Sequence, residues 1–268
     1  MDYSGLRWKS AADRKRISAG LKELRAGLSK VPAKGAGAFL LATWNIREFG
    51  GTKGGGRTDD AIYYIAECIS HFDLVAVQEV RRDLAALRRV MRLLGPNWDV
   101  IYTDVSYVES GNHERLAFIY DRNQVFFRGL AGEIVLPKDE ESVITQIART
   151  PFICGFQSGW AKFNLCTVHI YYGTGDNNDI RVNEIARTAS ILAKKAADYI
   201  EVEKKLTYSP ENLVLLGDFN IAKKTHKTYS ALVDNGFTIP DQLQSLPGSN
   251  VKKDKFYDQI AFYKKARS

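Results

Sequence analysis

The segment NLVLLGDFN, residues 212–220, places polar side chains directly after an apolar run. Residues 213–216 are typical of a buried strand, and a carboxylate at the end of such a strand is costly unless a cation or a hydrogen bond stabilises it. Asp218 and Asn220 are two positions apart, so on an extended chain their side chains point the same way. An acid and an amide presented together at a strand end indicate a functional site.

Five further apolar stretches also carry a polar side chain at or near one end. Taken singly, an Asn or Asp there is usually a turn former, a His is usually a core residue, and a Glu can cap the helix that follows. All of them together are hard to assign to turns, because the runs that they flank are so apolar. They are Asn45 in FLLATWNI, Glu79 in DLVAVQEV, Glu114 in NHERLAFIY, His169 in FNLCTVHI and Asp258 in KFYDQIAFY.

The residue types in this set favour a hard metal ion. Clustered carboxylates repel one another unless a cation lies among them. The set offers carboxylate and amide oxygens, without cysteines or paired histidines at metal spacing. Such ligands favour Mg²⁺, with Mn²⁺ as the alternative, over zinc.

The elements that must position these residues are short strands mixed with helices. Their order combines hairpin-like pairs (115–121 with 124–130, and 151–157 with 163–170) with helical crossovers. This order predicts an α/β fold in which two mixed, largely antiparallel β-sheets pack as a sandwich flanked by helices. Strands are expected at 39–45, 73–78, 99–103, 115–121, 124–130, 151–157, 163–170, 212–217 and 256–263, and helices at 58–70, 82–94, 179–206 and 226–235.

Residues 1–37 are expected to form a basic N-terminal helix and a linker, ahead of a domain at 38–268. Ile17, Leu21, Leu24 and Leu28 recur at helical spacing with Lys and Arg between them. We expect this helix to dock on the domain; an arm that contacts DNA or a partner is the alternative.

Composition narrows the class of protein. The formal charge of +7 permits attraction to a polyanion such as nucleic acid, although ordinary solubility charge explains it equally. No apolar run is long enough to span a membrane, and the N-terminus lacks a signal-peptide pattern. The odd number of cysteines predicts free thiols in a reducing, cytoplasmic compartment. They are Cys68, Cys154 and Cys166.

Six short motifs, taken in their order along the chain, give the sequence a recognisable pattern. They are TWNIREFG, DLVAVQEV, ERLAFIYD, CTVHIYYG, LLGDFN and YDQIAF, and they span about residues 38–263. In this order they resemble the endonuclease/exonuclease/phosphatase superfamily, and within it the DNase I-like nucleases. The resemblance implies a DNase I-like fold and metal-assisted hydrolysis of a phosphodiester.

The resemblance also assigns roles to the residues at the strand ends. It implies that Glu79 is the principal metal carboxylate and that Asn45 is the amide beside it. His169 corresponds to the imidazole that contacts the scissile phosphate, and Glu114 to the carboxylate that orients this imidazole. A carboxylate on one imidazole nitrogen fixes the tautomer of the ring, which makes this pairing physically reasonable.

The remaining roles concern the attacking water and the substrate. Asp218 resembles the acid that positions or activates the water, and Asn220 the amide that steadies the phosphate. Asp258 resembles the acid that supports the second catalytic histidine of the family. Arg81 resembles an arginine that contacts the nucleic-acid groove, and Arg149 one that contacts a phosphate.

The sequence departs from the family pattern near its C-terminus, where an SDH motif is expected to precede a last strand. Ten residues follow Asp258, and they contain no histidine. The fold is therefore expected to lack its last strand and the domain to be incomplete at the C-terminus. The chain is then a fragment, a natural short form that is weakly active or inactive, or a protein that obtains this strand from a partner or a further chain segment.

These observations favour a Mg²⁺-dependent phosphodiesterase that acts on DNA in the manner of an endonuclease. One alternative is a phosphatase or phospholipase of the same superfamily, for which we find no membrane-facing hairpin or head-group pocket. The other is a catalytically impaired nucleic-acid-binding pseudoenzyme or fragment, which the absent SDH motif favours and the retained acids disfavour. No membrane partner is expected.

Overall fold

The computed structural model describes residues 1–35, 37–50, 56–105, 113–136, 146–173, 179–203 and 212–264. The strands are β1 (Leu41–Phe49), β2 (Leu74–Arg81), β3 (Trp98–Tyr102), β4 (Glu114–Asp121), β5 (Phe126–Glu133), β6 (Phe152–Ser158), β7 (Ala161–His169), β8 (Asn212–Ile221), β9 (Phe237–Thr238) and β10 (Phe256–Tyr263). The helices are the 3-10 helix η1 (Ser4–Trp8), α1 (Ala11–Leu28), α2 (Asp59–Ser70), α3 (Ala85–Leu94), α4 (Asp179–Glu203), α5 (Lys227–Val233) and α6 (Asp241–Gln244). No helix in these ranges is long and apolar enough to cross a bilayer.

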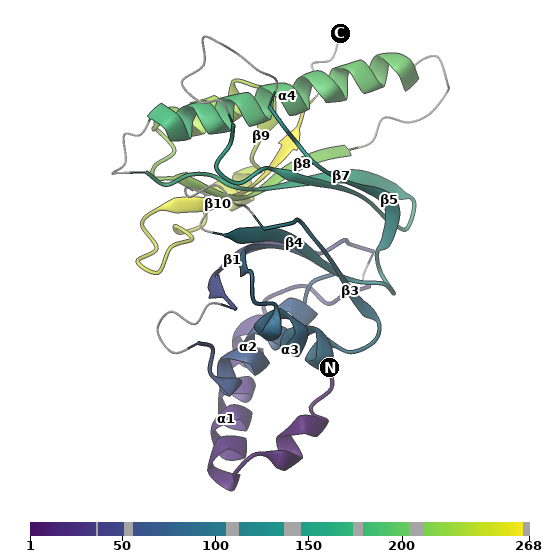
Figure 1. The fold of residues 1–268 in the computed structure, drawn as a ribbon, viewed down its shortest axis with the longest axis vertical. Helices are drawn as coiled ribbons and strands as arrows, with labels where there is room; N and C mark the ends of the chain where they lie inside the picture. Colours follow the sequence, from purple (N-terminus) through teal and green to yellow (C-terminus); the bar gives the residue numbers. More distant parts are fainter. Residues whose placement is uncertain are drawn as a thin grey trace.

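The strands form two sheets that pack face to face, with helices on their outer faces (Figure 1). The first sheet has the order β1-β2-β4-β3, and the second has the order β5-β6-β7-β8-β10-β9. Helices α2 and α3 pack against the first sheet, and α4 and α5 pack against the second. The predicted α/β sandwich of two mixed sheets is confirmed.

Apolar side chains fill each interface between these layers. The layer between the two sheets is aromatic, and its centre is Phe156, which lies 5.5 Å from Phe118 and 5.4 Å from Tyr120 between ring centroids. A second cluster joins α2 and α3 to the first sheet, and a third joins α4 and α5 to the second. Because both faces of each sheet are covered, the central strands are nearly continuous apolar runs, as the sequence shows.

One predicted hairpin is wrong. The segments 115–121 and 124–130 correspond to β4 and β5, which belong to different sheets. Strand β4 already has partners on both sides, β2 and β3, so no edge remains for β5. The chain turns at Asp121, whose carbonyl accepts the Val125 N–H at 2.9 Å, and then enters the second sheet beside β6. The other predicted hairpin, β6 with β7, is confirmed, with pairing from Ser158 opposite Ala161 to Phe152 opposite Thr167.

The described strands change sheet only at this point. Strands β1 to β4 lie in the first sheet and β5 to β10 in the second. The N-terminal part of the chain therefore builds one layer of the sandwich, and the part after residue 125 builds the other.

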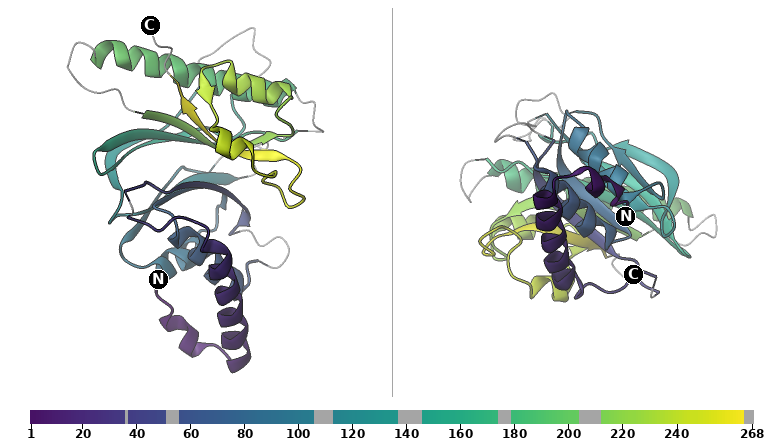
Figure 2. Two further views of the ribbon diagram at one scale, coloured as in Figure 1. Left: turned by 180° about the vertical axis from the view of Figure 1, so that it is seen from behind. Right: turned by 90° about the horizontal axis from the view of Figure 1, so that it is seen from below.

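Helix α1 packs across α2, outside the sandwich (Figure 2). Ile17 and Leu21 are buried against Tyr63, and Gly20 allows the close approach, because a Cβ atom there would lie 2.1 Å from the Tyr64 hydroxyl. Arg25 binds the buried Glu67 carboxylate at 2.6 Å. The expected docking of this helix is therefore present, whereas the division into 1–37 and 38–268 stays a prediction.

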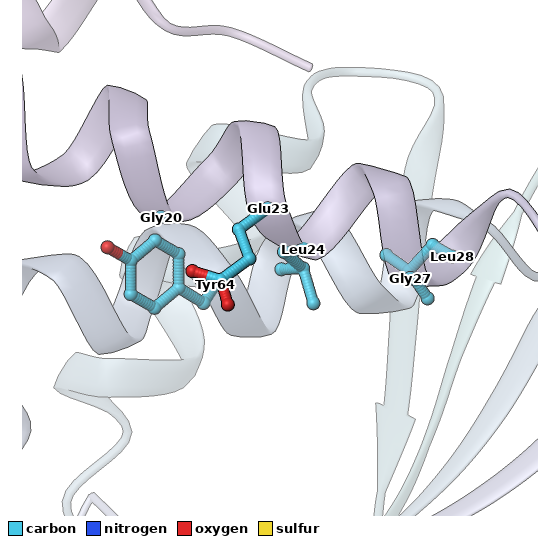
Figure 3. A pocket seen from close by; sticks show the side chains of 6 residues that line it. All are labelled: Gly20, Glu23, Leu24, Gly27, Leu28 and Tyr64. Atoms are coloured by element: carbon cyan, nitrogen blue, oxygen red, sulfur yellow. The ribbon is translucent and has the colours of Figure 1, made fainter.

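A groove between α1 and α2 lies apart from the strand ends (Figure 3). It is lined by Gly20, Glu23, Leu24, Gly27, Leu28 and Tyr64. None of the predicted site residues lines it.

Strand β1 lies at the edge of the first sheet. Among the described strands it pairs only with β2, in parallel. This edge can accept another strand, so a partner or chain segment that supplies a last strand stays a prediction. The thiols of Cys154 and Cys166 are buried and that of Cys68 is half-buried, and all three are free as expected.

Candidate active site

Register brings the predicted residues together from both sheets. In the parallel pair β7 and β8, His169 lies opposite Asp218. In the antiparallel pair β8 and β10, Asp218 lies opposite Asp258. The first sheet contributes Asn45 from β1 and Glu114 from the start of β4. The site is therefore assembled across the interface between the sheets.

Glu114 and His169 form the first contact across this interface. The Glu114 Oε2 atom lies 2.9 Å from Nδ1 of His169, and both side chains are almost fully buried. Burial opposes ionisation of Glu114, but the His169 ring and the Arg149 guanidinium outweigh it and hold the pKa of this carboxyl below its usual value. An ionised Glu114 fixes the orientation of the imidazole and leaves Nε2 facing the site.

Asp218 forms the second contact. Its Oδ2 atom accepts a hydrogen bond from the Asn45 side chain at 2.8 Å and lies 3.8 Å from His169 Nε2. Its Oδ1 atom accepts the backbone N–H of Asn220 at 2.8 Å. These contacts fix the carboxylate beside the imidazole, where it can hold a water molecule.

The backbone around Asp218 is specialised. Gly217 has φ +136°, and a Cβ atom there would lie 2.1 Å from the Val168 carbonyl oxygen, so only glycine allows β8 to approach β7 this closely. Asn220 has φ 52°, in the left-handed region, and its side-chain amide donates to the Ile170 carbonyl at 2.7 Å. Strain at non-glycine residues is typical of functional sites. The predicted pair Asp218 and Asn220 thus lies in one cluster, although the Asn220 amide is directed at the backbone.

Asp258 is the most perturbed acid of the cluster. Burial, and then the neighbouring Asp218 carboxylate, raise the pKa of Asp258 to about 7, against the lowering influence of Ser249, His169 and the Asn45 backbone N–H. Its Oδ1 atom is buried and has no hydrogen-bond partner among the described residues. A cation or a proton at this position would relieve the repulsion between the two carboxylates.

Glu79 lies at the end of β2 with a left-handed backbone, φ 62°. Its Oε2 atom accepts the Glu48 N–H at 2.8 Å, which directs the carboxylate toward β1. No contact in the described part of the chain joins it to Asp218 or His169. Its predicted metal role therefore stays a prediction.

The donors near β1 are compatible with a hard cation. Asn45 Oδ1, like Asp258 Oδ1, is buried without a hydrogen-bond partner among the described residues. The described residues contain no cluster of three or more His, Cys, Asp or Glu side chains arranged around a metal position. Mg²⁺ does not require such a cage, since it commonly binds one or two carboxylates and takes its other ligands from water and substrate phosphate.

The two predicted nucleic-acid-binding arginines contact carboxylates. Arg149 donates to Glu114 Oε2 at 2.6 Å and is 6% exposed. Arg81 lies 2.7 Å from the Glu48 carboxylate and 3.5 Å from that of Glu114. Both residues therefore surround Glu114, and their contact with nucleic acid stays a prediction.

Sequence reasoning missed a buried pair on α4 that supports the site from behind. The Glu184 carboxylate accepts the backbone N–H groups of Ala148 and Tyr171, each at 2.8 Å. Arg181 is fully buried and donates to the Asn220 carbonyl at 3.0 Å. Both lie on the helix face that also buries Ile185. The signal in the sequence was therefore a pair of charged residues at positions where helical periodicity predicts apolar ones.

Gln78, which precedes Glu79 at the end of the motif DLVAVQEV and had no predicted role, is fully buried in β2. Its amide donates to the hydroxyls of Thr167 at 2.9 Å and Thr43 at 3.1 Å, and so joins β7 to β1. Burial raises the pKa of Glu184, although the backbone N–H groups of Tyr171 and Ala148 and the charges of Arg149 and His169 act to lower it. Buried polar groups with satisfied partners fix the register of the elements that they join.

Comparison with known proteins places this fold in a class. No protein-family model matches the sequence, and no curated protein matches it significantly. Solved structures do match: an endonuclease/exonuclease/phosphatase family protein from Bacteroides thetaiotaomicron aligns with TM-score 0.59 at 18% identity, over 84% of this chain and 81% of that chain. The chain has the fold of the endonuclease/exonuclease/phosphatase proteins.

Two further structures with this fold have named activities or ligands. A mannosyl-6-phosphatase from Bacteroides thetaiotaomicron aligns with TM-score 0.56 at 17% identity, over 84% of this chain and 85% of that chain. D. rerio TDP2, solved with a single-strand DNA product, aligns with TM-score 0.55 at 11% identity, over 84% of this chain and 83% of that chain. At these identities the likeness concerns the fold.

Proposed function

We propose that this chain is a divalent-metal-dependent phosphodiesterase that hydrolyses DNA phosphodiester bonds in the manner of an endonuclease. The observation that carries the proposal is the buried cluster in which Glu114, His169, Asp218 and Asn45 contact one another across the two sheets. A structural role alone does not require a buried imidazole between two carboxylates at strand ends.

His169 and Glu114 act on the phosphate. With Glu114 at Nδ1, the ring presents Nε2 to a non-bridging oxygen of the phosphate and stabilises the charge that develops there. Arg149 donates to the same Glu114 oxygen that lies beside His169 Nδ1, and so keeps the carboxylate in position against the ring.

Asp218 acts on the water. Its carboxylate is fixed by Asn45 and Asn220 and can accept a proton from a water molecule in line with the leaving oxygen. Asp258, with its raised pKa, is a suitable group to hold or release a proton near neutral pH.

A Mg²⁺ ion, or Mn²⁺, would be held by Asn45 and Glu79, with Asp258 close by. When bound, such an ion neutralises charge on the phosphate oxygens. Its removal should therefore abolish turnover without unfolding the protein.

Charge supports nucleic acid over a smaller phosphate ester, and the fold is compatible with both. The net charge of +7 favours a polyanion, and TDP2, with the same fold, was solved with a DNA product. The mannosyl-6-phosphatase of the same fold makes hydrolysis of a phosphomonoester the second candidate.

The test is cleavage of supercoiled plasmid and of a labelled oligonucleotide, in Mg²⁺ and in chelator. We expect nicking in Mg²⁺ only, and a loss of roughly 10²- to 10⁴-fold in His169→Ala and in Glu79→Ala. Glu23→Ala, which changes an exposed glutamate on α1, is the matched control and should retain the full rate.

Three other results would contradict the proposal. Nicking that is equal in all variants would place the chemistry elsewhere or in a contaminant. Release of phosphate from mannose 6-phosphate without nicking would favour the phosphatase. DNA binding without cleavage in any metal would leave a binding-only protein.

A further inference from the structure

Two tyrosines form an aromatic pair beside the catalytic cluster. Tyr172 and Tyr257 meet edge to face, with ring centroids 6.0 Å apart and planes inclined at 81°. Tyr172 is 42% exposed, which is unusual for a ring so close to buried site residues. No step of the proposed hydrolysis uses either ring.

A buried cation, the Arg181 guanidinium, packs against the Tyr172 ring. The Arg181 guanidinium lies 4.7 Å from the ring centroid and is itself fully buried. It also donates to the carbonyl oxygen of Tyr172 and to that of Asn220. One face of the ring is therefore fixed by a cation–π contact, and the ring is held in place by the same arginine that holds a site residue.

Short stretches of hydrogen-bonded backbone connect both tyrosines to the cluster. Ile170, two residues before Tyr172, donates its N–H to the Asp218 carbonyl at 2.8 Å, and its own carbonyl accepts the Asn220 amide. Tyr257 directly precedes Asp258, which lies opposite Asp218 in the sheet. The aromatic pair thus follows His169 and precedes Asp258 along the chain, beside the candidate cluster.

We infer that Tyr172, backed by Arg181 and flanked by Tyr257, is a stacking platform for an unpaired nucleobase adjacent to the scissile phosphate. The inference rests on the proposed function and specifies its substrate, a single-stranded or locally unpaired nucleic acid. A base inside a duplex has both faces covered by its neighbours, whereas an unpaired base can stack on an exposed ring. Stacking tolerates any base, so the platform contributes affinity without sequence preference.

The test measures binding in chelator, where no cleavage occurs. One single-stranded oligonucleotide carries 2-aminopurine, whose emission falls on stacking, and a second of equal length and charge carries abasic sugars at the same positions. Wild type is compared with Tyr172→Ala, Tyr172→Leu and Tyr172→Phe. Trp160→Ala is the control, because Trp160 is 93% exposed at the opposite end of β7 from His169.

We expect Tyr172→Ala to bind the base-bearing strand about 5- to 100-fold more weakly, with no change for the abasic strand. Tyr172→Phe keeps the ring and should bind as wild type does. Tyr172→Leu keeps an apolar cover over Arg181 and should show the same loss as Tyr172→Ala, so the test does not depend on one variant folding. Thermal unfolding of each variant confirms that it is folded.

Two results would overturn the platform alone: an equal loss for both strands, or no loss for either, while wild type binds both. If wild type binds neither strand and mannose 6-phosphate protects it against thermal unfolding, the platform and the nucleic-acid function both fail. The two failures are therefore distinguishable.

Discussion

At the scale of single residues, the proposed function depends on the pairing of Glu114 with His169. Glu114 Oε2 lies within 2.9 Å of His169 Nδ1 and within 2.6 Å of Arg149 Nε, and all three side chains are almost fully buried. Their orientation therefore depends on charged contacts that solvent cannot replace. A change that preserves the shape of Glu114 but removes its charge isolates this effect.

We expect Glu114→Gln to lower kcat about 10- to 100-fold with little change in KM, because the imidazole loses its fixed orientation. Steady-state cleavage kinetics measure this directly. Glu23→Gln, the same chemical change at an exposed position on α1, should leave kcat unchanged. A rise in KM at constant kcat would instead indicate that Glu114 contributes to binding.

The strand-end positions of these residues and the pairing of Glu114 with His169 could be predicted, but the partners of the two arginines could not. The order of motifs predicted Glu114 with His169, and the structure brings the two together. Arg81 and Arg149 were expected to contact nucleic acid, and the structure directs both at carboxylates. Local sequence does not say which buried acid a distant arginine will reach, because that depends on packing across the sheets.

At the scale of elements, α4 acts as a support for two loops of the site. Through Glu184 it fixes the backbone at Ala148, next to Arg149, and at Tyr171, after His169. Helix periodicity predicted the helix itself. The same periodicity did not reveal its function, because a charged pair on the apolar face is a weak signal without the strands that it contacts.

Glu184→Gln should destabilise the fold by about 1–3 kcal/mol, because the two backbone N–H groups bind different carboxylate oxygens and an amide replaces one of these oxygens with a donor NH₂ group. Cleavage should also slow, since the loops that carry Arg149 and follow His169 lose their anchor. Urea unfolding and cleavage rates measure the two effects, with Lys195→Gln at an exposed position of α4 as the control. Unchanged activity in a destabilised variant would show that Glu184 has only a structural role.

The β4–β5 error has a cause at this scale as well. Two apolar segments separated by a few polar residues usually pair as a hairpin. Here β3, which precedes β4 in the sequence, occupies the edge that β5 would need. Periodicity cannot detect this competition, since it describes each strand but not its neighbours.

At the scale of the whole molecule, α1 is held to the sandwich by a buried carboxylate. Burial opposes ionisation of Glu67, but Arg25 and the Tyr3 hydroxyl outweigh it, and the pKa of Glu67 falls below its usual value. Since the folded pKa is lower than the unfolded one, this contribution to stability is complete above the unfolded pKa. It is lost as the pH falls through the folded value.

Glu67→Gln should therefore lower the free energy of unfolding by about 1–3 kcal/mol at pH 7, because Arg25 and Tyr3 lose a charged partner. The difference from wild type should shrink as the pH is lowered from 7 and falls through the folded pKa of Glu67. Urea unfolding at pH 7 and at a series of lower pH values tests this. A difference that stays constant over the series would mean that the loss comes from packing.

The chain passes between the two sheets once, so the residues of the proposed site are divided between two segments of the sequence. The part before residue 122 carries Asn45, Glu79 and Glu114, and the part after residue 125 carries His169, Asp218, Asn220 and Asp258. Neither part holds the whole of the proposed site. If the chain were cut at this crossing, turnover would require the two fragments to associate. Turnover would then rise with the concentration of the fragments and would report their association.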